Sequence, residues 1–354
     1  MTKYRRLKNY DRLVIEAYYN AGYSQIEIAA VLGVHRSTIC RELRKGLYEH
    51  LNSDYTTRQA YSSNLAQDYT DFQATSKGKE VKIADDHALA SFLEEKIAKD
   101  KYSPDAALAL IRTDPVLSAR FKVSISTTTL YRYIDKGLFL NLTNKDLPHA
   151  HKKNYKRVRR VQKRSSAGTS IENRPADILS RKYFGDWEMD TVKGIRGKTK
   201  GCLLVLTERK TRNELTFKLP DQKAASVVAA LDDLEDLLGN DFSNVFHTIA
   251  VDNGVEFADF EGMQRSKFTS GNRTSIYYCH AYSSCERGSN ENANRLIRRH
   301  APKGTDLDQL THDDVKTIQR WINNYPRKLL GYRTSAELFR EEVAAIGVLA
   351  ENFL

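Results

Sequence analysis

Three acidic residues occupy alternate positions in one short stretch, Gly185-Asp186-Trp187-Glu188-Met189-Asp190-Thr191-Val192. Alternate side chains of a β-strand point to the same face, so Asp186, Glu188 and Asp190 would lie together. Strands usually contain few acidic residues, and this grouping therefore needs a reason. One reason is a solvated edge strand. The other is a cation site completed by acids from elsewhere in the chain, and two later segments favour it.

The later segments supply Asp252, which follows a strand expected at Val245–Val251, and Glu291, near the start of a helix expected at about Asn290–Arg299. Carboxylate oxygens from separate elements suit Mg²⁺ or Mn²⁺, which also bind substrate phosphate oxygens. Two such ions about 4 Å apart would activate an attacking oxygen and stabilise a leaving oxygen at phosphorus. Each acid also has a structural interpretation: Asp252 can begin a turn, and Glu291 can be a first-turn acid favoured by the helix dipole.

The elements that must position these acids follow the order of an RNase H-like fold. Gly201–Thr207 is a continuous apolar run typical of a central strand, and Glu214–Leu219 alternates like an antiparallel partner. A helix at Ala224–Leu238 and further strands at Val245–Val251 and Ile276–Cys279 follow. We expect residues 179–304 to form an α/β catalytic core, a mixed sheet flanked by helices. Helices in residues 305–354 would complete this core or mediate self-association.

Residues 1–50 predict an all-α helix-turn-helix domain. Helices are expected at Tyr10–Ala21, at Gln25–Leu32 after a Ser24/Glu27 capping box, and from about Ser37 to Lys45, with a tight turn at Gly33-Val34. The third helix would present polar and basic side chains to DNA, namely Arg36, Ser37, Thr38, Arg41 and Arg44. A small three-helix bundle with solvated arginines is the alternative.

Residues 51–84 are expected to form a helix, with an amphipathic pattern at Thr57–Tyr69, and a mobile connector. Residues 85–140 predict a second helical domain. In it the segment Ser126–Ile134 follows a short loop and resembles another recognition helix, with Thr127, Thr128 and Arg132 facing outward. A plain helical bundle is the alternative. Residues 141–178 form a basic linker, whose cations we expect to contact phosphates, among them Lys152, Lys153, Arg157 and Arg160.

The bulk composition agrees with a polyanionic partner. There are 56 Lys and Arg against 45 Asp and Glu, a net charge of +11 that is compatible with DNA or an acidic membrane surface. No apolar run reaches the roughly 18 residues of a spanning helix, and the N-terminus lacks the pattern of a signal peptide. Four cysteines without zinc-ligand spacing indicate neither a disulfide framework nor structural zinc. We expect a cytoplasmic protein.

Several motifs together resemble the bacterial DDE transposases of the insertion sequence thirty (IS-thirty) family. They are Ser37–Leu43 in the helix-turn-helix, Gly185–Asp190, Thr207–Thr211, Asp252–Phe257, Arg287–Asn294, Pro302–Thr305 and Asn323–Lys328, followed by Leu330-Gly331-Tyr332. The resemblance covers nearly the whole chain, and the joint match is highly specific. It departs from the family at Asp186, where the family usually has His, and at Ala281–Cys285.

This resemblance implies that Asp190, Asp252 and Glu291 are the catalytic, metal-binding triad. Between the last two acids lie 38 residues, more than the mid-thirties spacing typical of the family. Counting alone would select Glu286, but Glu291 lies in the family's Arg-Gly-Ser-Asn-Glu-Asn context. The surplus residues would form a longer loop near residues 262–274.

The resemblance also implies cutting and joining of double-stranded DNA at an element's terminal inverted repeats and at target DNA, with Mg²⁺ or Mn²⁺ as cofactor. Water or a 3′-hydroxyl would be the nucleophile. Four residues are expected to contact the DNA strands, Arg287, Asn294, Arg298 and Lys303. A homodimer or higher oligomer on DNA in the bacterial nucleoid is implied as well.

Two other functions remain open from the sequence. One is a sequence-specific DNA-binding regulator whose RNase H-like domain is catalytically silent. The other is an RNase H-like nuclease without sequence preference. Three mutually repelling carboxylates have no physical reason to stay together in a silent site, which favours the transposase.

Overall fold

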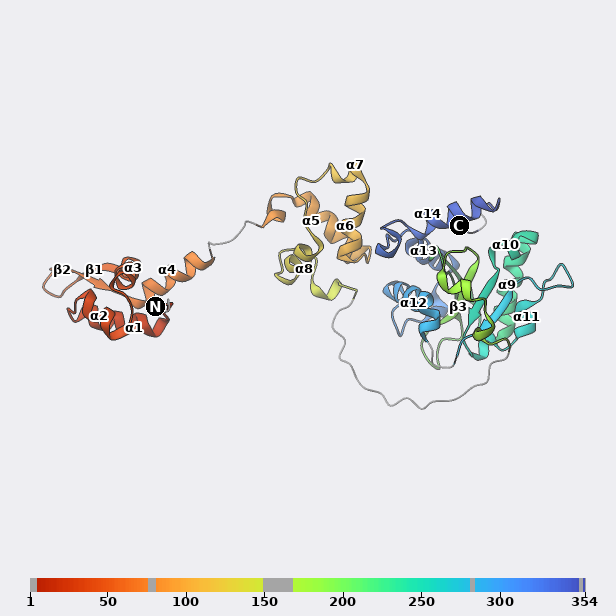
Figure 1. Cartoon of the computed structure of the whole chain (residues 1–354), viewed down its shortest axis with the longest axis horizontal. Coiled ribbons are helices and arrows are strands. Elements are labelled where there is room, and N and C mark those ends of the chain that lie inside the picture. Colours follow the sequence, from red (N-terminus) through yellow and green to blue (C-terminus); the bar gives the residue numbers. More distant parts are fainter. Residues whose placement is uncertain (1–4, 76–80, 149–167, 281–283, 350–352, 354) are drawn as a thin grey trace. The chain divides into compact units, whose positions relative to one another are not determined.

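The computed structural model of the chain describes residues 5–75, 81–148, 168–280, 284–349 and 353 (Figure 1). The chain divides into two compact units, one up to Val81 and one from Lys82 onward. Each unit is described by itself. The finer boundaries expected at residues 50, 84, 140, 178 and 304 stay predictions.

The first unit begins with the three expected helices, α1 (Asn9–Asn20), α2 (Gln25–Leu32) and α3 (Arg36–Gly46). Ser24 and Glu27 form the predicted capping box at the start of α2, and Gly33 ends that helix with a φ of 65°. Such a left-handed conformation suits glycine, and it allows the tight turn into α3. Ile39 and Leu43 of α3 are buried, as their spacing predicted.

A β-hairpin that was not predicted follows α3. Its strands are β1 (Leu47–Leu51) and β2 (Thr57–Tyr61), and they pair in an antiparallel register. The helix expected at Thr57–Tyr69 is therefore wrong over its first residues, since α4 spans Ser63–Thr75. Tyr61 explains the difference, because its fully buried ring packs with the three-helix core and leaves residues 57–61 extended.

A five-stranded mixed sheet forms the centre of the second unit and confirms the RNase H-like fold. The strands are β3 (Asp186–Lys193), β4 (Cys202–Glu208), β5 (Glu214–Leu219), β6 (Thr248–Val251) and β7 (Ser275–Tyr278), in the order β5-β4-β3-β6-β7. The pairs β3–β4 and β4–β5 are antiparallel, whereas β6 is parallel to β3 and to β7. The expected strand at Val245–Val251 is shorter than predicted, because α10 (Phe242–Val245) occupies the start of that apolar run.

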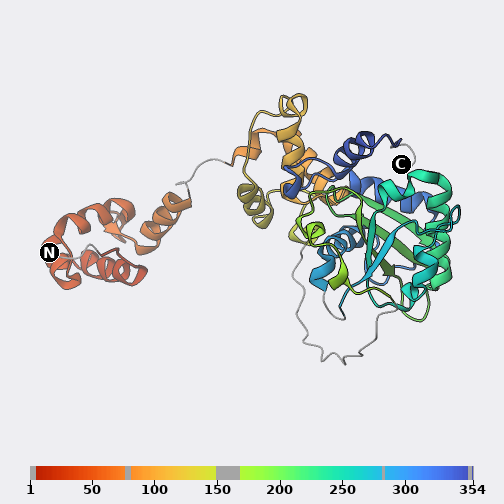
Figure 2. The same cartoon turned by 45° about the vertical axis from the view of Figure 1, so that its right-hand side comes forward.

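Helices cover both faces of this sheet (Figure 1 and Figure 2). On one face α9 (Ala224–Leu238) packs with α10 and with side chains of β3 such as Trp187 and Met189. On the other face α12 (Gly288–His300) and α13 (His312–Asn323) pack with Val192 of β3 and its neighbours. The acids of β3 alternate with Trp187 and Met189 and so face α12. The remaining helices of this region are α11 (Phe260–Gln264) and α14 (Ser335–Ala345).

Residues 82–148 form a helical region that belongs to the second unit. Its helices are α5 (His87–Glu94), which continues as a π-helical segment at Glu95–Lys99, α6 (Pro104–Thr113), α7 (Pro115–Ser118) and α8 (Thr127–Asp135). A short loop precedes Ser126 as expected, and α7 lies between α6 and this loop, where no helix was predicted. The region packs on α13: Ser103 Oγ is 2.7 Å from Tyr325 Oη, and Trp321 Nε1 donates to Asp100 O at 2.7 Å.

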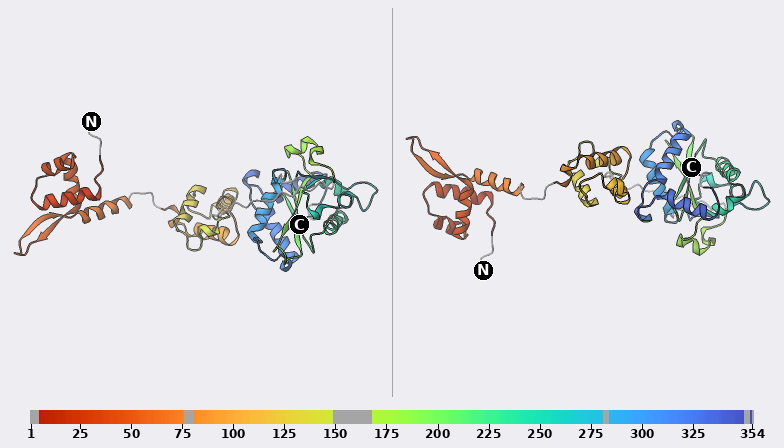
Figure 3. Two further views of the ribbon diagram at one scale, coloured as in Figure 1. Left: turned by 90° about the horizontal axis from the view of Figure 1, so that it is seen from below. Right: turned by 90° about the horizontal axis from the view of Figure 1, so that it is seen from above.

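Short 3₁₀ segments connect these elements, at Lys82–Asp85, Asn144–Asp146, Ile171–Asn173, Ala176–Ser180, Gly239–Asp241, Val255–Phe257, Ser284–Arg287, Leu307–Gln309 and Lys328–Leu330. Figure 3 shows the sheet end-on between its helical layers. No helix within the described ranges is both long and apolar enough to cross a membrane.

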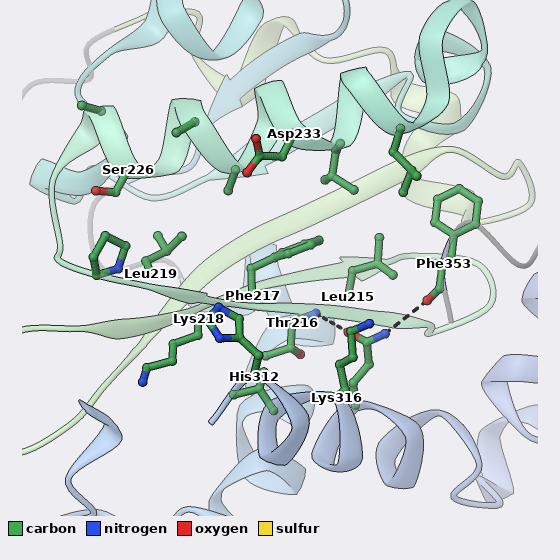
Figure 4. A pocket seen from close by; sticks show the side chains of 18 residues that line it. Leu215, Thr216, Phe217, Lys218, Leu219, Ser226, Asp233, His312, Lys316 and Phe353 are labelled. Atoms are coloured by element: carbon green, nitrogen blue, oxygen red, sulfur yellow. Dashed lines mark hydrogen bonds between the residues drawn. The ribbon is translucent and has the colours of Figure 1, made fainter. Parts of the chain in front are cut away.

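The edge strand β5 lies in a groove of about 580 Å³ between α9 and α13 (Figure 4). Gln319 of α13 accepts a hydrogen bond from Thr216 N at 2.7 Å, and Asn323 accepts one from Glu214 N at 2.8 Å. These side chains satisfy outward-facing amides of the edge strand, which would otherwise be open for pairing. Gln319 also donates to Phe353 O at 3.3 Å, at one end of the groove.

Candidate active site

Two of the predicted acids meet because β3 and β6 are adjacent parallel strands. Glu188 pairs in register with Ala250. Two residues further along both strands are Asp190 and Asp252, so the register brings the two carboxylates to the same end of the sheet. The side chain of Asp190 is 22% exposed and that of Asp252 is 42% exposed. Both carboxylates are therefore open to a ligand from solvent.

Arg287 lies between the two carboxylates. Its Nη1 is 3.3 Å from Asp190 Oδ1 and its Nη2 is 3.0 Å from Asp252 Oδ2. Nη1 also donates to Met189 O at 3.1 Å. Burial and the charge of Asp190 raise the pKa of Asp252, and the guanidinium opposes this rise. One positive group thus stabilises two carboxylates that would otherwise repel each other.

Hydrogen bonds fix the direction of each carboxylate. Asn294 Nδ2 donates to Asp190 Oδ2 at 2.8 Å, and Thr191 N donates to Asp190 Oδ1 at 2.9 Å. Gly254 N donates to Asp252 Oδ1 at 2.8 Å. The hydrogen bond from Gly254 forms because the turn after β6 is tight. A Cβ added to Gly254 would lie only 2.8 Å from Asp252 Oδ1. The site is therefore preorganised.

Glu291 lies in the first turn of α12, three residues before Asn294 on the same side of the helix. Its side chain is 52% exposed, and its Oε1 accepts a hydrogen bond from Arg295 Nη2 at 2.6 Å. Among the residues that the structure describes, no three His, Cys, Asp or Glu side chains are close enough together to hold a metal ion. The structure thus brings Asp190 and Asp252 together, and it leaves Glu291 one helical turn from the residue that contacts Asp190.

Glu286, which counting alone would have selected, binds His280 instead. His280 Nδ1 is 2.7 Å from Glu286 Oε1, and His280 N donates to Glu286 Oε2 at 2.9 Å. Burial works against ionisation of Glu286, but these hydrogen bonds lower its pKa. No contact with Asp190 or Asp252 is found for Glu286 in the described part of the chain.

The two other acids of β3 have structural partners. Glu188 is fully buried, and its Oε2 accepts hydrogen bonds from Ser289 N and Asn290 N, each at 3.0 Å. It thereby caps the N-terminus of α12, where free amide groups need an acceptor. Asp186 accepts a hydrogen bond from Thr248 Oγ1 at 2.6 Å, and burial raises its pKa. The acidic stripe of β3 therefore divides into one site carboxylate and two that hold the sheet and α12 in place.

Comparisons with known proteins decide the family. A family model described as a helix-turn-helix domain matches residues 3–46. The probable transposase for the insertion-like sequence element IS1161 of Streptococcus salivarius is 33% identical over 344 residues, which cover 95% of this chain and 94% of that protein. The chain belongs to the IS30 family of insertion-sequence transposases.

Other relatives of this transposase agree. The transposase for insertion sequence element IS4351 of Bacteroides fragilis is 30% identical over 345 residues, with 93% of this chain and 94% of that protein covered. Transposase InsI for insertion sequence element IS30C of Escherichia coli strain K12 is 28% identical over 250 residues, which cover 69% of this chain and 62% of that protein. Among solved structures, the catalytic core domain of BIV integrase matches 46% of this chain and 98% of that chain, with 18% identity and a TM-score of 0.35.

A basic groove of about 900 Å³ opens beside the site of the transposase. The exposed side of α12 contributes Glu291 and Asn294 to its lining, and β3 contributes Thr191. Six basic side chains line the groove, Lys101, Lys145, Arg295, Arg298, Arg299 and Lys303, against two acidic ones, Asp146 and Glu291. A groove with this charge is suited to a phosphate backbone.

The residues predicted to contact DNA strands have different surroundings. Arg298 Nη2 donates to Lys193 O at 2.8 Å, and Lys303 is exposed at the rim of the groove. Arg287 and Asn294 are directed at the carboxylates. In the helical region Thr127 Oγ1 donates to Asp105 Oδ1 at 2.9 Å.

The remaining predicted contacts lie on helices or outside the described residues. Thr128 and Arg132 are exposed on α8. On α3 the arginines 36, 41 and 44 are exposed, while residues 37 and 38 are half-buried. The linker cations Lys152, Lys153, Arg157 and Arg160 lie outside the residues that the structure describes.

From the sequence, Glu256 of the transposase can support the site from behind Asp252 or be a plain surface acid, and the structure excludes the surface position. This side chain is buried, and its Oε1 accepts a hydrogen bond from Thr191 Oγ1 at 2.6 Å and lies 3.0 Å from Lys193 Nζ. Burial opposes its ionisation, but the Thr191 hydrogen bond and Lys193 lower its pKa. It ties the turn after Asp252 to β3. Its position four residues after Asp252, within the motif Asp252–Phe257, was the available signal.

Proposed function

We propose that this transposase cuts and joins DNA strands at the ends of its insertion sequence, at a divalent-metal site formed by Asp190, Asp252 and Glu291. The observation that carries the proposal is the parallel register of β3 and β6, which brings Asp190 and Asp252 together on either side of the Arg287 guanidinium. Their oxygens are hard donors in an accessible site, and this donor set fits Mg²⁺ or Mn²⁺. When bound, such ions supply Lewis-acid charge at the scissile phosphate.

The chain's own residues orient and complete this site. Asn294 and Thr191 hold Asp190, and Gly254 N holds Asp252, before any substrate arrives. Asn294 Oδ1 is buried without a hydrogen-bond partner in the described part of the chain, so the site still has an unused acceptor. Glu291 would be the third ligand after its release from Arg295.

The partner in this proposal is duplex DNA. The helix-turn-helix would bind the terminal inverted repeats, and the basic groove beside α12 would hold the strand that is cut. Because an insertion sequence has two ends, we propose that at least two copies of the chain act together. The mass of the complex with terminal-repeat DNA in light scattering tests this; a single copy per two ends would contradict it.

A second candidate is a DNA-binding regulator with a silent core. It is favoured by Arg287, which pairs with both Asp190 and Asp252, and by Glu291, which pairs with Arg295. In this alternative the arginines would be permanent partners of the acids. The regulator would bind terminal-repeat DNA and leave it intact whatever metal is present.

Cleavage of terminal-repeat DNA by the full-length chain in Mg²⁺ or Mn²⁺ separates the candidates. Asp190→Asn, Asp252→Asn and Glu291→Gln should each reduce cleavage by more than about 100-fold, because changes even to groups that support a metal ligand cost roughly 10–100-fold. Duplex binding should stay close to that of the wild type. Glu286→Gln is the matched control and should cleave normally. If cleavage is lost in Glu286→Gln but not in Glu291→Gln, the third metal ligand is Glu286 and not Glu291. If the wild type leaves the DNA intact, the regulator is supported.

A further inference from the structure

An arginine-lined pocket lies beside the active site. Its volume is about 480 Å³, and Arg174, Arg181 and Arg209 contribute to its lining. Arg209 Nε lies 3.3 Å from Glu188 Oε1, and Glu188 is two residues before Asp190 on the same face of β3. That separation is ~7 Å along a strand. The pocket is therefore a neighbour of the carboxylate site and separate from it.

Arg209 is buried, with 3% of its surface exposed, yet its hydrogen-bonding capacity is not used. Its Nε and Nη1 have no hydrogen-bond partner among the described residues, and Glu188 is its one ion-pair partner there. A buried guanidinium with unpaired N–H groups is costly, so such a group usually has a ligand or ordered water. All three arginines line this pocket. Burial lowers the pKa of Arg209, the charge of Glu188 opposes this, and the charges of Arg174 and Arg181 lower it further.

Arg174 repeats this pattern, since its Nη1 is buried without a hydrogen-bond partner in the described part of the chain. The two carboxylates that line the pocket do not form ion pairs with the arginines. Glu172 and Glu286 both bind His280, at 3.1 Å and 2.7 Å. Arg181 has a positive φ of 55°, a conformation that is uncommon for a residue with a side chain. Three arginines therefore line one pocket whose two carboxylates pair with His280, and among the described residues Glu188 is the one acid that pairs with any of the three.

We propose that this pocket binds a phosphoryl group and that, in the complex with DNA, this group is a backbone phosphate of the strand bound at the active site. Planar guanidinium groups match the oxygens of a phosphate with paired hydrogen bonds, which is the geometry Arg provides and Lys does not. Glu188, the ion-pair partner of Arg209, lies two residues from Asp190 along β3, a spacing of ~7 Å that is about the rise of two nucleotides in one strand at ~3.4 Å each. The DNA assignment rests on the proposed function, whereas the phosphate assignment does not.

The test uses the full-length chain with the double substitution Arg174→Gln/Arg181→Gln. Arg209 is left intact because its removal would leave Glu188 buried without its ion-pair partner. Arg340→Gln is the matched control, because Arg340 is exposed on α14 and does not line the pocket. The first measurement is thermal unfolding in inorganic phosphate and in chloride at equal ionic strength. Phosphate should raise the unfolding temperature of the wild type and of the control, and it should have no effect on the double variant.

The second measurement is the salt dependence of binding to terminal-repeat DNA, by fluorescence anisotropy. Each phosphate contact adds about 0.9 to the slope of log K against log salt concentration, so the double variant should have a slope smaller by about one. The double variant Arg174→Lys/Arg181→Lys retains the charge without the planar donors. It should keep most of the slope and lose most of the phosphate effect.

Three outcomes would overturn the proposal. Without stabilisation of the wild type by phosphate, the pocket is not a phosphate site. If phosphate stabilises only the chains with an intact pocket but the slope is unchanged, the site takes free anions and its assignment to DNA is wrong. If the double variant unfolds at lower temperature in chloride and the lysine variant does the same, the arginines are structural. None of these readouts depends on strand cleavage, so they remain separate from a failure of the proposed function.

Discussion

The single side chain of Arg287 balances the charge of the two carboxylates at the site. Its guanidinium lies within 3.3 Å of Asp190 and 3.0 Å of Asp252, where it neutralises two carboxylates that face each other. A divalent ion between these carboxylates would do the same. The guanidinium and a bound ion would therefore compete for one place, and Arg287 would stabilise the chain when metal is absent.

The first prediction concerns this competition. In buffer with a chelator, Arg287→Gln should reduce the free energy of unfolding by about 2 kcal/mol, the usual contribution of hydrogen bonds to charged groups. Adding Mn²⁺ should raise the unfolding temperature of the variant more than that of the wild type, because no guanidinium has to be displaced. Calorimetric titration of Mn²⁺ should likewise give tighter binding to the variant.

Arg295→Gln is the control for Arg287→Gln. Arg295 pairs with Glu291 on the surface of α12, where both side chains are more than half exposed. Such a pair contributes little to stability, at most about 1 kcal/mol. If the two variants respond alike to the chelator and to Mn²⁺, Arg287 does not occupy the place of the metal.

The helix α12 shows how one element depends on a buried acid of another. Glu188 of β3 accepts both Ser289 N and Asn290 N, and α12 carries Asn294 and Glu291 toward the site. Glu188→Ala should remove this cap and destabilise the chain by roughly 0.5–2 kcal/mol, the range for lost caps, and it also removes the ion-pair partner of Arg209. Glu188→Gln retains an acceptor oxygen and should lose less stability. Equal losses of unfolding temperature in the two variants would contradict a capping role.

Glu214 gives the fold a pH dependence. It is fully buried at the start of β5, and burial raises its pKa from 4.5 to about 8, although Arg327 and the hydroxyl of Thr207 oppose the rise. The folded chain then holds a proton that the unfolded chain releases above about pH 4.5. Glu214 therefore favours the folded state fully below that pH, and this contribution is lost as the pH rises to about 8.

The corresponding measurement compares the wild type with Glu214→Gln between pH 4.5 and 8. The amide resembles the protonated acid and does not titrate. The free energy of unfolding of the variant, minus that of the wild type, should therefore increase steadily with pH over this range. A difference that stays constant with pH would show that Glu214 does not hold its proton in the folded chain.

Regular patterns made most elements predictable from the sequence. The apolar run of β4 is seven residues long, a length that favours a strand, and the apolar residues of α9 recur at helical spacing. An apolar run at Val245 fits a helix or a strand equally well, and only packing around Phe242 and Phe246 places α10 there. The hairpin was missed because its strands are short and mostly exposed, with burial confined to the end of β2.

The sequence predicted the acidic residues of the site but not the residues that contact them. Asp190 and Asp252 stand out by residue type and by position on expected strands. The contacts of Arg287 and Glu188 join residues about a hundred positions apart in the chain, and no local pattern contains them. For this reason Arg287 was expected to contact DNA. The sequence does not show whether a basic residue near an acidic motif pairs with a carboxylate or with a phosphate.

At the scale of the whole molecule, the helix-turn-helix and the candidate catalytic carboxylates lie in separate compact units. The first unit has exposed arginines on α3 and matches a helix-turn-helix family model. The second unit contains the carboxylates and the basic groove. Phosphate contacts in the groove would bind any duplex, whereas contacts of a recognition helix in the major groove depend on sequence.

This separation leads to a prediction about specificity. In the full-length chain, Arg36→Ala and Arg41→Ala should each weaken binding to terminal-repeat DNA by ~1–3 kcal/mol if the side chain reads a base, and should leave affinity for unrelated duplex nearly unchanged. Cleavage of terminal-repeat DNA should fall toward the level on unrelated DNA, because the second unit and its carboxylates are intact. Arg340→Ala changes an exposed residue of α14 and should alter neither the binding nor the cleavage of either duplex. If affinity for both duplexes falls equally and the salt slope decreases by about one, the arginines of α3 bind phosphates, and the choice of the element's ends must lie elsewhere in the chain.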